Sequence, residues 1–152
     1  LSSAASDVYK RQGVWDLIHP KIVAVSQKLF EDGHYANAAE DAFVEINDRV
    51  KKLFMKVNPT ASKIPDGHTA MNMVFSDNAP LVEFCDRSTE TGSNIQKGYM
   101  QMLAGAMSAL RNPKAHANIT ITKDDAMRRL MFASMLMYKI DEAIDYSKIQ
   151  ER

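Results

Sequence analysis

The chain has one cysteine and no long hydrophobic run, and each absence excludes a class of protein. Because Cys85 has no second cysteine to pair with, no disulfide can form within the chain, and we expect a protein of the reducing cytoplasm. The longest apolar run, residues 130–138, is interrupted by Ser134 and is far too short to span a bilayer. The sequence therefore gives no indication of a secreted, disulfide-stabilised protein or of a membrane protein.

An excess of charge is also lacking, since 19 basic residues face 19 acidic residues and the formal net charge is zero. Proteins that bind long nucleic acids through bulk electrostatics carry a positive excess. Any contact with RNA would therefore have to be local.

Familiar catalytic and metal-binding patterns are absent as well. The sequence contains neither a glycine-rich phosphate loop, GxxxxGK[ST], nor a GxSxG nucleophile turn. His19, His34 and His68 lack a second ligand at metal-binding spacing on a shared helix face, so we interpret them as structural and expect no metal and no cofactor. The ten methionines are best explained as core filler.

What is present is the composition of one globular domain. The 152 residues are 45% hydrophobic and 25% charged, which is enough to bury a core. Residues 1–12, LSSAASDVYKRQ, look like a translated sequencing adaptor. We therefore expect residues 1–12 to be an artefact, the domain to cover residues 13–152, and the natural N-terminus to be missing.

Four long helices are predicted from the spacing of apolar residues and from helix-terminal signals. The first begins near His19 and ends before Gly33, and the second runs from about Tyr35 to Val57. A third, capped by Ser93, covers about residues 94–111, and a fourth begins at Thr122 and reaches about residue 144. The short turn at Gly33 predicts that the first two helices form an antiparallel hairpin.

The segment between the two helix pairs has a different character. Residues 58–67 are rich in loop-forming side chains, residues 69–75 could form a short helix, and residues 78–94 are again loop-like with a brief extended segment at 81–84. The predicted fold is therefore all-α: an up-down bundle of about four main helices with an irregular insertion between the helix pairs.

The chemistry of the chain is concentrated in residues 111–116, where Arg111, Asn112 and His116 follow the third predicted helix. Asn112 precedes a proline, which disfavours helical backbone, so the helix should end near Arg111. Arginine presents a planar fork that suits phosphate, and histidine transfers protons near neutral pH. From spacing alone, a surface arginine near a helix-capping histidine remains the simpler interpretation.

A wider pattern favours the functional interpretation. Between about residues 17 and 143, including Asp66-Gly67 and Phe75, the sequence resembles the Ymh family of the HEPN superfamily, small helical proteins of which many are ribonucleases. The superfamily signature is an arginine, a polar residue and a histidine a few positions later, and Arg111, Asn112 and His116 fit it. The other residues that carry the resemblance are Gln96, Lys97, Gly98, Tyr99, Gly105, Ala106, Pro113 and Ala115.

The resemblance implies a HEPN-like fold and a metal-independent endoribonuclease that uses the ribose 2′-hydroxyl as nucleophile. His116 would transfer protons, Arg111 would stabilise charge on the phosphate, Asn112 would orient substrate or imidazole, and Lys114 is a candidate phosphate contact. Because each chain offers one such histidine, we expect a homodimer in which two motifs line one cleft.

Two further expectations come from the same resemblance, and two alternatives stay open. The protein would act as a toxin or in phage defence, and an antitoxin or other regulator would be a partner. The first alternative is a non-catalytic helical dimer that binds RNA, a nucleotide or a protein. The second is a purely structural helical-bundle dimer, which would have no affinity for nucleotides.

Glu40, Asp41 and Glu45 form a carboxylate face on the second predicted helix. Such a face is usually solvated. It would matter for catalysis only if it faced the Arg111 turn.

Overall fold

The computed structural model describes residues 13–111 and 119–151, and its secondary structure over these ranges is entirely helical. A short 3-10 helix, η1 (Val14–Asp16), precedes α2 (Pro20–Glu31), α3 (Tyr35–Val57), α4 (Gly67–Val74), α5 (Glu90–Ala109) and α6 (Lys123–Ser147). The predicted all-α bundle with four long helices is confirmed. Residues 1–12, predicted to be an artefact, lie outside the described residues, so the domain boundaries stay a prediction.

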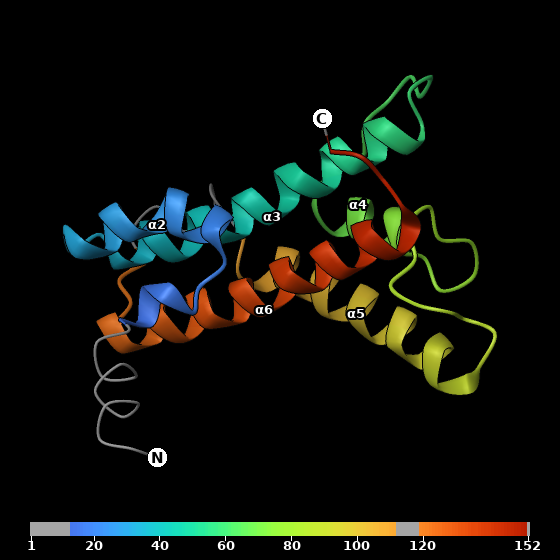
Figure 1. Ribbon diagram of the computed structural model, residues 1–152. Coiled ribbons are helices and arrows are strands. Elements are labelled where there is room, and N and C mark those ends of the chain that lie inside the picture. The colour runs from blue at the N-terminus through green and yellow to red at the C-terminus, as the bar shows by residue number, and fades with distance from the viewer. Residues whose placement is uncertain (1–12, 112–118, 152) are drawn as a thin grey trace, which may run out of the picture.

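The α2–α3 hairpin forms as predicted, with α2 lying along the first half of α3 (Figure 1). His19 caps α2, since its Nδ1 accepts a hydrogen bond from the backbone N–H of Lys21 at 3.1 Å, and Pro20 occupies the first turn. Gly33 ends the helix with a φ of +86°, a conformation that glycine adopts without strain. The buried Ser26 hydroxyl then donates to the Ala38 carbonyl at 2.7 Å and joins the two helices.

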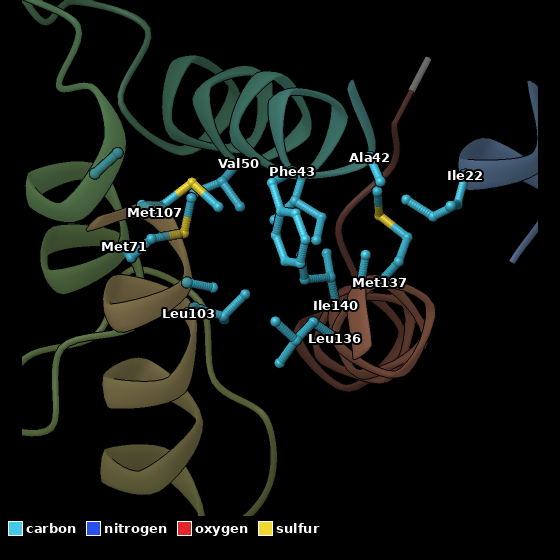
Figure 2. Close-up of a cluster of buried hydrophobic side chains, with 14 of the residues drawn as sticks. Ile22, Ala42, Phe43, Val50, Met71, Leu103, Met107, Leu136, Met137 and Ile140 are labelled. Atoms are coloured by element: carbon cyan, nitrogen blue, oxygen red, sulfur yellow. The ribbon is translucent and has the colours of Figure 1, made fainter. Parts of the chain in front are cut away.

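The core lies between α3 and α6 and extends to α4 and α5 on one side and to α2 on the other (Figure 2). Met71, Met107 and Met137 are buried in it, as expected of core filler. That explanation is wrong for five other methionine residues, which are at least 37% exposed: Met55, Met73, Met102, Met131 and Met135. Met131 and Met135, together with Tyr138, form an exposed apolar stripe on α6.

The insertion between the helix pairs is held by one buried amide. The Nε2 of Gln96 on α5 donates to the carbonyls of Phe75 and Val82 at 3.0 and 3.1 Å, and its Oε1 accepts from the Phe84 N–H at 2.9 Å. Residues 81–84, predicted to be extended, form no strand in this part of the described chain. Their backbone groups bind Gln96 and the end of α4 instead.

The start of α5 differs from the prediction by one turn. Thr89, not Ser93, is the cap, and its Oγ1 accepts from the Gly92 N–H at 3.0 Å. A Cβ at Gly92 would lie 1.8 Å from the Asp86 carbonyl oxygen, so glycine is required there by close approach of the preceding loop. At α6 the predicted cap is confirmed, because the Thr122 Oγ1 accepts from the Asp125 N–H at 3.1 Å.

Of the helices that the structure describes, none combines the length and the apolar character that crossing a bilayer requires.

Candidate active site around Arg111

Arg111 stands immediately after α5, as its position before Asn112-Pro113 predicts. Its backbone N–H still bonds to the Ala106 carbonyl at 3.2 Å, which fixes the direction in which the side chain leaves the helix. The side chain is 20% exposed and reaches the start of α4. A helix end and a helix start thus meet at one guanidinium group.

Asp66, the residue before α4, is the partner of Arg111. Nη1 and Nη2 of the guanidinium donate to the same carboxylate oxygen, Oδ2, at 3.1 and 3.0 Å. The other oxygen, Oδ1, receives the Asn47 amide at 3.0 Å and lies 3.2 Å from the Lys51 ammonium. Hydrogen bonds from Asn47 and Arg111 hold the pKa of the Asp66 carboxyl well below its usual range.

Asn47 fixes the backbone on which this arrangement rests. It lies on α3, is 3% exposed, and its Oδ1 accepts from the Gly67 N–H at 2.9 Å while its amide nitrogen donates to Asp66. One buried side chain therefore binds two consecutive residues at the start of α4. The orientation of Asp66, and through it that of Arg111, depends on this contact.

Gly67 is required for the approach of Arg111. Its φ of +57° lies in the left-handed region, and a Cβ added there would lie 2.7 Å from Arg111 Nη2. The absence of a side chain therefore lets the guanidinium lie against the first turn of α4.

The site carries a surplus of positive charge at the surface. Lys51 and Arg111 supply two cations against the single Asp66 carboxylate. The Asp66 side chain is 52% exposed and that of Lys51 is 33% exposed, so a ligand can reach both. Such an arrangement can hold an anionic oxygen, and phosphate is the biological anion that an arginine fork suits best.

The structure locates one of the four predicted site residues. Asn112, Lys114 and His116 lie outside the described residues, and only the position of Arg111 is available. On the second helix, the carboxylates Glu40, Asp41 and Glu45 were the candidates for facing this turn. Asn47 and Lys51, further along α3, contact Asp66 instead.

The remaining histidines have distinct settings. His19 is structural as predicted, because it is 5% exposed, caps α2 and places its Nε2 2.9 Å from Asp141 on α6. His34 precedes α3 without a capping side-chain hydrogen bond. His68 directly follows Gly67 and its Nδ1 shares a 3.1 Å hydrogen bond with the Asn72 amide.

A family model described as "Protein of unknown function (Hypoth_ymh)" matches residues 16–140. The chain belongs to the Hypoth_ymh family. No curated protein and no solved structure gave a significant match. The part of this Hypoth_ymh protein that matches the family model contains all the residues of the Asp66 cluster, namely Asn47, Lys51, Asp66, Gly67 and Arg111.

Sequence reasoning missed Asn47, Lys51 and the role of Asp66. A weak signal existed, since Asp66-Gly67 follows a proline at the start of a short helix, and Asn47 and Lys51 are spaced to share one face of α3. Neither pattern points to Arg111. Only the packing of α4 between α3 and α5 brings these residues and Arg111 together in this Hypoth_ymh protein.

Proposed function

We propose that this Hypoth_ymh protein is a metal-independent endoribonuclease of HEPN type. The observation that carries the proposal is the Arg111 guanidinium, which is oriented by Asp66 and Gly67 at a surface with excess positive charge. It stands five positions before His116 in the sequence, so a fixed cation and a proton-transfer group are close along the chain. A phosphodiester cleavage without metal needs these two components.

In the proposed reaction the ribose 2′-oxygen attacks the adjacent phosphorus while the bond to the 5′-oxygen of the next nucleotide breaks. His116 takes part in moving the proton from the 2′-hydroxyl or to the departing 5′-oxygen, and Arg111 stabilises the negative charge that develops on the phosphorane. Asn112 orients the imidazole or the substrate, and Lys114 contacts a neighbouring phosphate. The products are a 2′,3′-cyclic phosphate and a 5′-hydroxyl end.

The proposal includes a homodimer, a regulator and a cytoplasmic setting. A two-fold dimer would bring two copies of residues 111–116 to one cleft and supply both an acid and a base. The exposed apolar stripe Met131, Met135 and Tyr138 on α6 supports the existence of a partner surface. A toxin or defence role with a dedicated antitoxin would follow from such an activity.

The test is incubation with single-stranded RNA in EDTA beside Arg111→Ala and His116→Ala, with analysis of the product ends. Arg128→Ala is the matched control, because it removes an exposed arginine from α6. We expect cleavage to resist EDTA and to leave 2′,3′-cyclic phosphate. It should disappear in Arg111→Ala and His116→Ala, which stay folded, and persist in Arg128→Ala. No cleavage by the wild-type protein, or full activity of either motif variant, contradicts the proposal.

The positive surplus at Asp66 also supports a second function, the non-catalytic module that binds RNA or a nucleotide. Anion binding by Arg111 and Lys51 needs no proton transfer. This function predicts that RNA binds and is not cut, and that His116→Ala binds as well as the wild type.

A further inference from the structure

The Asp66 carboxylate joins cations from two different helices, one on each of its oxygens. Arg111, after α5, binds Oδ2 at 3.0 Å, and Lys51, on α3, lies 3.2 Å from Oδ1. Asn47 prevents the carboxylate from turning, because it binds both Oδ1 and the next backbone N–H. The spacing of the two cations is therefore set by the fold.

Two cations fixed on one carboxylate can also hold a phosphodiester. Asp66 stays between them, so the phosphodiester would bind to the donors that the carboxylate leaves free, with one oxygen on Lys51 and the other on Arg111. Both cations have donors to spare: the Lys51 ammonium has three N–H bonds and Arg111 has a second N–H on each Nη, whereas Asp66 is their one anionic partner in the described part of the chain.

We infer that Lys51 is a second phosphate-binding residue of the Arg111 site, and that Lys51 and Arg111 together hold one phosphodiester of single-stranded RNA. Asp66 is then a positioning residue that sets the distance between the two cations. This inference rests on the proposed function for the identity of its ligand.

The neighbouring residue provides a matched control. Lys52 is exposed and belongs to the same helix, but consecutive residues on a helix point about 100° apart. It lines a small cavity beside Arg49, Lys56 and Glu151, on the side of α3 that faces the C-terminal segment. Lys52→Ala removes the same charge from the same helix without removing a contact of Asp66.

The experiment measures binding of a fluorescent 2′-O-methyl oligoribonucleotide, which cannot be cleaved through its 2′-oxygen, over a series of KCl concentrations. Lys51→Ala should weaken binding about fivefold at low salt. It should also reduce the slope of log K against log salt by about 0.7, the contribution of one phosphate contact to a single strand. Lys51→Arg should retain the wild-type slope, and Lys52→Ala should change the slope and the affinity little.

Each outcome decides one proposal or the other. If Lys51→Ala changes the slope while the wild type never cuts RNA, the ribonuclease proposal fails and the assignment of Lys51 stands. If the wild type cuts RNA but Lys51→Ala binds with the wild-type slope, or Lys52→Ala loses as much as Lys51→Ala, the assignment of Lys51 is overturned. A wild-type protein that does not bind the oligonucleotide also overturns it.

Discussion

Arg49 and Arg111 both pair with carboxylates, and their surroundings differ in a way that separates stability from function. Arg49 on α3 has a side chain that is 8% exposed. Nε and Nη2 contact Glu151 at 2.8 and 2.7 Å, Nη2 also lies 2.6 Å from Asp141, and Nη1 donates to the Met137 carbonyl at 3.4 Å. Every nitrogen of this guanidinium is bonded within the protein.

Arg111, in contrast, has among the described residues a single carboxylate partner, which it shares with another cation. Its two terminal nitrogens share one oxygen of a half-exposed carboxylate, and a second cation, Lys51, binds the same group. Among groups in direct contact, the Arg49 cluster has two carboxylates for one arginine, whereas the Arg111 cluster has two cations for one carboxylate. The guanidinium of Arg49 is therefore fully paired within the protein and serves the fold, whereas Arg111 and Lys51 share one carboxylate and keep donors for a ligand.

The largest effect on stability should come from Arg49→Met, which leaves Asp141 and Glu151 without their shared cation. We expect the free energy of unfolding, measured with urea, to fall by about 3 kcal/mol. RNA cleavage per folded molecule should be unchanged. The control Lys52→Ala should stay within about 0.5 kcal/mol of the wild type. A folded Arg49→Met protein that has lost cleavage would remove the distinction between the two arginines.

Asn47→Ala should lower both the stability of the fold and the rate of RNA cleavage. The change leaves the buried Gly67 N–H without its acceptor and releases Asp66, so unfolding should become easier by about 2 kcal/mol. Cleavage should fall at least about tenfold, because Arg111 loses its fixed orientation. Asn72→Ala, which removes an amide whose partner is the exposed His68, is the control and should alter neither the urea transition nor the rate.

Gly67→Ala should separate stability from RNA cleavage most clearly. The left-handed backbone makes alanine unfavourable by about 1 kcal/mol, and the new Cβ displaces the end of the Arg111 side chain rather than backbone. We expect a folded protein whose cleavage approaches that of Arg111→Ala. Gly98→Ala is the control: apart from its chain neighbours and the backbone of its own helix, no atom lies within 4 Å of the added Cβ, and a helical alanine should stabilise by about 1 kcal/mol. Full cleavage by Gly67→Ala would show that the approach of Arg111 is not needed.

The smallest effect concerns acid pH. The pKa of Asp66 is lowered in the folded state, so its contribution to stability is complete above the unfolded pKa of about 4 and is lost as pH falls toward the folded value. Asp66→Asn should therefore lose less stability than the wild type between about pH 4 and pH 2. Urea midpoints at several pH values measure this, and parallel curves for the two proteins would contradict it.

The fold was largely predictable from sequence because its signals are local. The apolar spacing of α3 and the Thr122 cap of α6 depend on residues within one or two turns, and both predictions are confirmed. The cap of α5 was predicted at the wrong residue because Gly92 looks like a helix breaker. Glycine is required there because the Asp86 carbonyl lies beside it, and Asp86 belongs to an irregular loop that no periodic pattern describes.

The site was less predictable because it is assembled across the chain. Arg111 could be chosen from the short motif, but Asp66 lies 45 positions earlier, and Asn47 and Lys51 belong to another helix. A polar residue on a helix face says nothing of what will pack against it. Which amide and which lysine bind Asp66, the partner of Arg111, depends on the position of α4, and that position is set by the whole core.

The contacts of His19 also limit the order in which the chain can fold. Its backbone N–H bonds to Ser134, 115 positions away, and its ring bonds to Asp141, 122 positions away. The α2–α3 hairpin can form while the chain is still being synthesised, but the polar groups at the start of α2 find these partners only after most of α6 has left the ribosome. A nascent chain stalled before that point would expose the apolar face of α3 that α6 later covers, and would be a natural substrate for chaperones.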